Sequence, residues 1–237
     1  MKAMLFAAGL GTRLKPFTEN HPKALAPVNG KPLLQRNIEY LIDYGITEII
    51  INVHHFADQI ISFLEEHNYF GIEITISDET DQVLETGGGL LKVRELLTED
   101  FIVMNVDILT DLDLKALIKA HQTQNALVTL AVSDRTSSRK LFFDEQNTLK
   151  GWRNLNTNEE ISAIETLDHC KELAFSGIHV IHPTIFDKIT QRGKFSIMKV
   201  YMELMAHETI VGFDHSGGIL IDVGRPSSVL EAEEIFK

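Results

Sequence analysis

The chain has few cysteines, prolines and glycines, the residues that cross-link a fold or interrupt its helices and strands. Cys170 is its one cysteine in 237 residues, so no internal disulfide and no cysteine-based metal cluster can form. This usage is typical of a reducing compartment, and we expect a cytoplasmic protein in which Cys170 is an ordinary thiol. Proline and glycine are also scarce, with 6 and 15 copies, which favours a well-ordered globule.

Positive charge is scarce too. Lysine and arginine number 22 against 34 aspartates and glutamates, for a net charge of −12, which argues against a nucleic acid or an anionic membrane as the partner. No apolar run approaches the roughly 20 residues of a membrane helix, and we expect no export signal before the first predicted strand, which the chain approaches from Lys2. An acidic protein that binds anions must concentrate its positive charge locally, and a divalent cation would help it.

The first half alternates between two hydrophobic periodicities. Continuous apolar runs predict strands, and apolar residues at helical spacing predict the helices between them. The predicted strands are 4–8, 47–53, 72–76 and 101–104, and the predicted helices are 32–45, 57–67, 86–97 and 112–123. This alternation is typical of an α/β fold with a Rossmann-like, doubly wound, mostly parallel sheet, which binds ligands at the carboxyl ends of its strands.

The second half changes character. Strands at 127–133, 140–144, 149–155 and 172–181 are joined by polar turns and predict a small antiparallel extension over the acceptor end of the site. Helices at about 183–190 and 197–206, strands at 209–213 and 219–223 and a last helix at 226–236 follow. We expect a mixed sheet and a single domain over residues 1–237, without a C-terminal β-helix domain.

The chain is organised around the stretch from Leu5 to Lys31. A strand empties there into a loop with Gly9 and Gly11, whose backbone N–H groups can approach an anion because no Cβ stands in the way. Arg13 and Lys23 supply positive charge. A lone Gly-x-Gly is more often a turn, and this loop fits neither the P-loop nor the dinucleotide fingerprint. A third kind of polyphosphate loop is indicated.

The full pattern of this loop resembles one enzyme family. Residues 7–18 read Ala-Ala-Gly-Leu-Gly-Thr-Arg-Leu-Lys-Pro-Phe-Thr, and residues 22–32 read Pro-Lys-Ala-Leu-Ala-Pro-Val-Asn-Gly-Lys-Pro. Both are similar to sugar-phosphate nucleotidyltransferases. The string Glu-Thr-Gly-Gly-Gly at 85–89, with Phe-Ser-Gly-Ile at 175–178, is closest to N-acetylmuramic acid 1-phosphate uridylyltransferases. Mannose-1-phosphate guanylyltransferases more often carry Gly-Thr-Ala-Gly at the first of these places.

Two aspartates come at the carboxyl ends of predicted strands that are far apart in sequence. Asp107 and Asp222 could converge on one Mg²⁺, which prefers oxygen ligands and substrate phosphates. Taken singly, each aspartate is explained about as well by a turn or helix-cap role as by a metal-binding role. The resembled family binds its metal with an Asp in each context, which implies Mg²⁺ as cofactor. Val106 departs from the family, which usually has Gly there, so its side chain either crowds the substrate or merely shifts the loop.

Other candidates have simpler explanations. Asp111, in an Asp-x-Asp string, is interpreted as the N-cap of the following helix. His179 and His182 are predicted to face opposite sides of a strand, so we reject a histidine metal site. Ser176 and Ser216 lack a matched His–Asp arrangement, which gives nucleophilic catalysis little support.

The resemblance implies transfer of a nucleotidyl group from a nucleoside triphosphate to a sugar 1-phosphate, with UTP and N-acetylmuramic acid 1-phosphate as the expected pair. Alternatives are a GTP-dependent mannose-1-phosphate guanylyltransferase and a non-catalytic nucleotide-sugar-binding regulator. Arg13 and Lys23 are the expected catalytic residues, Gly177 should lie near the sugar, and the protein should be a monomer or a small homo-oligomer. The expected nucleotide-binding residues are Ala8, Gly9, Gly11, Thr12, Arg13, Lys23, Thr86, Gly87, Gly88 and Asn105.

Overall fold

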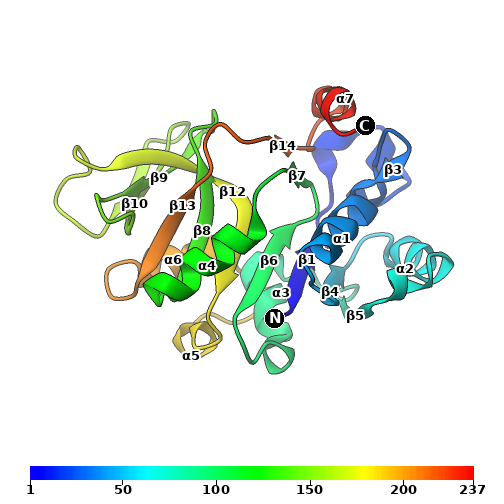
Figure 1. Ribbon diagram of the computed structural model, residues 1–237, viewed down its shortest axis with the longest axis horizontal. Coiled ribbons are helices and arrows are strands. Elements are labelled where there is room, and N and C mark those ends of the chain that lie inside the picture. The colour runs from blue at the N-terminus through cyan, green and yellow to red at the C-terminus, as the bar shows by residue number, and fades with distance from the viewer.

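A ten-stranded mixed sheet runs through the molecule in the computed structural model, which describes residues 1–237 (Figure 1). Its strands are β1 (Ala3–Phe6), β4 (Glu48–Val53), β5 (Glu73–Asp78), β6 (Phe101–Asn105), β8 (Val128–Ser133), β9 (Arg139–Phe143), β10 (Leu149–Asn154), β11 (Glu159–Ser162), β12 (Lys171–Ile181) and β13 (Ile210–Asp214). The order is β11-β10-β9-β12-β6-β1-β4-β5, with β8 pairing β12 and β13 pairing β8. The predicted mixed α/β sheet is confirmed.

The sheet has a parallel core and an antiparallel wing. β1 lies between β4 and β6 and runs parallel to both, with Ala3 opposite Ile49 and Ile102. β12 is antiparallel to β6 and leads into the hairpins of β9, β10 and β11. This wing is the predicted antiparallel extension. β11 was not predicted, because its four residues are all exposed and carry no hydrophobic pattern.

Helices cover both faces of the sheet (Figure 1). One apolar core joins the alternate strand residue Leu5 to α1, α2 and α4, and a second joins Met4 to α3, α5 and α6. This division follows from the period of two along a strand, which sends neighbouring side chains to opposite faces. No helix combines the length and apolar composition needed to cross a membrane. The helices are α1 (Leu33–Asp43), α2 (Ala57–Glu66), α3 (Glu85–Lys92), α4 (Leu114–Gln124), α5 (Ile185–Lys188), α6 (Ile197–Leu204) and α7 (Pro226–Ile235).

Two short ladders lie at the carboxyl edge of the parallel strands. β2 (Pro27–Val28) pairs with β3 (Lys31–Pro32), and β7 (Ile108–Thr110) pairs antiparallel with β14 (Leu220–Asp222). The second ladder puts Asp222 opposite Ile108, and the Val223 amide donates to the Asp107 carbonyl over 2.8 Å. The end of the chain is thereby brought beside the loop that follows β6.

The N-cap interpretation of Asp111 is wrong. α4 begins at Leu114, and Asp113 caps it by accepting from the amides of Lys115 and Ala116 at 2.9 and 3.2 Å. Asp111 instead accepts from the Ile219 amide at 2.7 Å. It therefore ties the segment before β14 to the segment after β7. The helix starts two residues too late for Asp111 to cap its free amides.

Candidate active site

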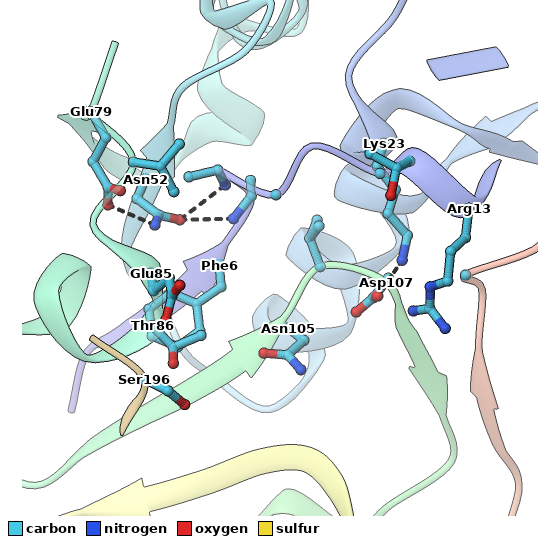
Figure 2. Close-up of a pocket in the computed structure, with 18 residues that line it drawn as sticks. Phe6, Arg13, Lys23, Asn52, Glu79, Glu85, Thr86, Asn105, Asp107 and Ser196 are labelled. Carbon is cyan, nitrogen blue, oxygen red and sulfur yellow. Dashed lines mark hydrogen bonds and ion pairs between the residues drawn. The ribbon is translucent and has the colours of Figure 1, made fainter. Parts of the chain in front are cut away.

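A cavity of about 420 Å³ opens at the carboxyl ends of β1, β4 and β6 (Figure 2). Its wall combines the loop after β1, the segment before α3 and the turn after β6. Most of the residues predicted from the sequence line it, namely Ala8, Gly9, Gly11, Thr12, Arg13, Lys23, Thr86, Asn105 and Asp107. Segments that are distant in sequence thus meet at the edge where a doubly wound sheet binds its ligands.

The loop after β1 presents unused backbone donors. The five amides from Gly9 to Arg13 donate no hydrogen bond within the chain. Gly11 has a φ of +61°, and a Cβ there would meet Thr18 at 2.8 Å and Lys23 at 2.9 Å, so only glycine fits. The Thr18 hydroxyl also donates to the Gly11 carbonyl over 2.9 Å. Consecutive free N–H groups around a left-handed residue form an anion-binding concavity.

A buried polar chain, which sequence reasoning missed, holds this loop in place. The Asn52 side-chain oxygen accepts from the Ala7 amide at 2.8 Å, and its nitrogen donates to Glu79 at 2.8 Å. The other Glu79 oxygen accepts from the Leu84 amide at 3.0 Å. Asn52 therefore links the loop after β1 to the segment before α3 (Figure 2). A lone amide in the apolar run of β4 was the available signal.

Basic and acidic side chains face each other on the opposite wall. The Lys23 ammonium forms an ion pair with Asp107, and Arg13 reaches toward the same place (Figure 2). A Cβ on Gly224 would meet both the Arg13 guanidinium at 3.0 Å and the Asp222 carboxylate at 2.8 Å. Arg13, Lys23, Asp107 and Asp222 are thus gathered in one region, as their motifs predicted.

The two carboxylates suit a small divalent cation. Asp222 has a buried oxygen, Oδ1, without a hydrogen-bond partner, and the neighbouring ladder brings Asp107 close to it. No group of three or more His, Cys, Asp or Glu side chains is arranged so that it could hold a metal ion by itself. Mg²⁺ typically uses one or two carboxylates together with substrate phosphates and water, so these residues fit such an ion when phosphate is bound.

Val106, beside Asp107, is directed mainly into the core. Its side chain is 4% exposed and belongs to the same apolar cluster as Ile38 of α1. The Val106 amide donates to Phe6, and its carbonyl accepts from Asn37 at 2.8 Å. Val106 lines the cavity, but its low exposure leaves little of the valine to crowd a substrate.

Gly87 and Gly88 lie behind the cavity wall. Their amides donate to the Phe195 carbonyl at 2.9 and 3.3 Å, and a Cβ on either would collide with Phe195 or Gly193. These glycines let α3 pack closely against the segment before α6. Thr86 lines the cavity, and its hydroxyl accepts from the Ile197 amide at 3.0 Å.

A second cavity, of about 540 Å³, lies between the parallel core and the antiparallel wing, and Arg13 lines both cavities. Phe175 of β12 and Trp152 of β10 are on its wall, as is Asp222. Gly177 lies two residues from Phe175 at a φ of +81°, and a Cβ there would meet Ile108 at 2.7 Å and Asn105 at 3.1 Å. Gly177 therefore lets β12 approach the turn after β6.

Ser176 has a histidine partner that the sequence did not reveal. The His215 Nε2 lies 2.8 Å from the Ser176 hydroxyl, and burial lowers the pKa of His215. Ser176 itself is 0% exposed, and the His215 Nδ1 has no hydrogen-bond partner. A sealed hydroxyl cannot reach a substrate, so the pair is not a nucleophile.

A sequence model described as nucleotidyl transferase matches residues 2–237. The chain belongs to this family. The nucleotidyl transferase is 32% identical over 236 residues to the N-acetylmuramate alpha-1-phosphate uridylyltransferase of Neisseria meningitidis, covering 99% of this chain and 98% of the relative. It is 28% identical over 242 residues to the mannose-1-phosphate guanyltransferase of Yarrowia lipolytica, covering 100% of this chain and 64% of that protein.

Solved structures share the fold of this nucleotidyl transferase. The crystal structure of HddC from Yersinia pseudotuberculosis superposes with a TM-score of 0.80 at 24% identity, covering 100% of this chain and 99% of HddC. The likeness confirms the Rossmann-like α/β class predicted from strand and helix alternation.

Proposed function

We propose that this nucleotidyl transferase transfers UMP from UTP to N-acetylmuramic acid 1-phosphate, giving UDP-N-acetylmuramic acid and pyrophosphate. One observation carries the proposal. The loop after β1, whose five amides from Gly9 to Arg13 donate no hydrogen bond within the chain, lines the same cavity as Lys23 and Asp107. Asp222 lies beside Arg13, next to Gly224. A run of donors beside paired basic and acidic groups suits a triphosphate with its counter-ion.

The reaction is an in-line displacement at the α-phosphorus. An oxygen of the acceptor phosphate forms a bond to this phosphorus while the bond to the bridging α–β oxygen breaks, and pyrophosphate leaves with that electron pair. The acceptor is already an anion, so no general base is required. Catalysis then depends on positioning and on neutralising charge.

Each residue has a part in that displacement. The amides of Gly9 and Gly11, with the Arg13 guanidinium, bind the β- and γ-phosphates and stabilise the leaving pyrophosphate. Lys23 bridges the α-phosphate and the acceptor phosphate. This requires its ammonium to exchange the Asp107 contact for phosphate oxygens.

Asp107 and Asp222 would hold Mg²⁺, and when bound the ion supplies positive charge at the α-phosphate. The orphaned Asp222 oxygen supports this assignment. Ala8, Thr12, Thr86 and Asn105 line the remaining cavity wall. We assign these four residues to the nucleotide, with Gly87 and Gly88 shaping the wall from behind and Gly177 shaping the sugar end.

A second candidate is transfer of GMP to mannose 1-phosphate. The similarity to the guanyltransferase of Yarrowia lipolytica over the whole of this chain supports it. The higher identity and near-complete mutual coverage with the uridylyltransferase of Neisseria meningitidis favour UTP and N-acetylmuramic acid 1-phosphate. A regulator that binds without turnover has less support, because the charged set is intact and Val106 is buried.

The test is a panel of nucleoside triphosphates and sugar 1-phosphates with Mg²⁺, scored by pyrophosphate release. We expect the UTP and N-acetylmuramic acid 1-phosphate pair to give the highest kcat/KM and EDTA to abolish release. Faster turnover of GTP with mannose 1-phosphate would select the second candidate. Thermal stabilisation by nucleotide with no product from any pair would select the regulator.

A further inference from the structure

Half of the arginines in this acidic chain gather at the second cavity. Arg13, Arg135, Arg139 and Arg225 line it, out of eight arginines in a sequence of net charge −12. None of the four forms an ion pair within the chain. Asp222 is the one acidic side chain among the lining residues. The side chains that line the cavity therefore carry more positive than negative charge, which suits an anionic ligand.

The four arginines come from two sides. Arg13 follows β1 and Arg225 follows β14, so both stand on the side of Asp222 and the nucleotide cavity. Arg135 lies in the loop between β8 and β9, and Arg139 is the first residue of β9, so both belong to the antiparallel wing. An acceptor phosphate held near Arg13 and Lys23 does not account for the second group.

Arg135 is the better fixed of the two wing arginines. Its Nη2 donates to the Phe175 carbonyl over 2.8 Å, which orients the guanidinium. Its Nε is buried and has no hydrogen-bond partner. A buried cationic donor left unpaired costs free energy, which a ligand oxygen would recover.

We propose that Arg135 and Arg139 bind a carboxylate on the acceptor sugar, so that the substrate class is an acidic sugar 1-phosphate. This rests on the proposed function, whose acceptor carries a lactyl carboxylate in addition to its phosphate. Guanidinium groups match the planar oxygens of a carboxylate. Trp152 and Phe175 on the same wall offer apolar surface to a sugar ring. A neutral hexose 1-phosphate would leave both wing arginines unpaired.

The test compares two acceptors that differ by the lactyl group. Wild type, Arg135→Gln, Arg139→Gln and the double variant are assayed with N-acetylmuramic acid 1-phosphate and with N-acetylglucosamine 1-phosphate. We expect each single change to raise KM for the acidic acceptor by about 10- to 100-fold, the range of a hydrogen bond to a charged group. KM for the neutral acceptor should change little, and kcat should hold for both.

Arg153→Gln is the matched control. Arg153 is also on the wing, but it pairs with Glu160 at 2.5 Å and lies 4.8 Å from the centre of the Phe142 ring, outside the cavity lining. It should leave both KM values unchanged. Arg135→Lys keeps the positive charge but loses the paired N–H donors of the guanidinium. Melting curves of all variants identify any loss of folding.

Binding measured by calorimetry separates this inference from the proposed function. N-acetylmuramic acid 1-phosphate is titrated into wild type and variants, with and without UTP. Arginine-dependent binding without pyrophosphate release from any pair would sustain the carboxylate site and sink the catalytic proposal. The carboxylate site would be overturned if the arginine variants lost affinity equally for both acceptors. It would also be overturned if wild type turned over both acceptors equally well. Inorganic phosphate competing with both acceptors only while Arg135 is present would also overturn it, in favour of a phosphate site.

Discussion

Lys23 and Asp107 form an ion pair at the wall of the nucleotide cavity, although 84 positions separate them in sequence. Their side chains are only 10% and 20% exposed. The pair holds both charged groups in place, and in the proposed function each group exchanges its partner for a ligand of the opposite sign. Little reorganisation is left for the moment of reaction.

The first prediction follows from this exchange. Lys23→Ala and Asp107→Ala should each lower kcat by ~100-fold or more, because each removes a preorganised charge contact. The double variant should be little worse than either single one, since the two residues act as a unit. Initial rates of pyrophosphate release provide the measurement, with the exposed Lys15→Ala as control. Near-normal release from either single variant would sink the assignment.

The second prediction separates the two loop glycines. Gly11→Ala should destabilise the protein by about 1–3 kcal/mol, through positive φ and contact with Thr18 and Lys23. Gly9→Ala should fold normally, because no atom lies within 4 Å of its added Cβ, but should raise KM for the nucleotide. Urea unfolding and steady-state kinetics distinguish the two effects. Gly217→Ala, with φ of +87° and no neighbour within 4 Å, isolates the backbone strain.

The third prediction concerns the buried chain through Asn52. Asn52→Leu should cost about 2–4 kcal/mol of unfolding free energy, because it leaves the Ala7 amide and the buried Glu79 carboxylate without their partner. The displaced loop should also raise KM for the nucleotide. Adding Glu79→Gln should restore part of the stability by removing the unpaired charge. If urea unfolding shows no recovery in the double variant, the charge of Glu79 is not the cause.

The fourth prediction is a pH dependence of stability. Burial lowers the pKa of His179 to about 3, whereas an unfolded histidine has a pKa of about 6.5. Between these values the unfolded chain binds more protons, so unfolding free energy falls as pH drops below about 6.5, by up to about 1.4 kcal/mol per pH unit. His179→Gln should flatten this slope. His207→Gln, at an exposed position, should leave the slope unchanged. The measurement is the midpoint of urea unfolding between pH 4 and 7 for wild type and both variants.

The residues around the first cavity could be predicted because their sequence signals are local. The loop after β1 is encoded in consecutive residues, and β4 and β6 are continuous apolar runs that only a parallel sheet buries on both faces. Asp107 follows the apolar run of β6, and Asp222 is the last residue of the short strand β14. Their proximity was expected because strand ends of a doubly wound sheet meet at one edge.

Long-range pairing explains what the sequence could not show. His215 meets Ser176 across 39 positions, and Arg135 meets the Phe175 carbonyl across 40. Neither pair follows a local pattern, because each depends on how the antiparallel wing folds onto β12. β7 has only three residues and is recognisable only from its pairing with β14. Asp111 was misassigned for the same reason, since its partner Ile219 is 108 positions away.

The ladder of β7 and β14 also sets the order in which the site can be assembled during synthesis. Arg13, Lys23 and Asp107 are synthesised before Asp222, which lies 115 positions after Asp107 in the chain. Until that segment pairs with Ile108 and its neighbours, one of the two carboxylates is missing. A nascent chain should therefore gain the ability to bind nucleotide before it gains the complete set of charged groups for turnover.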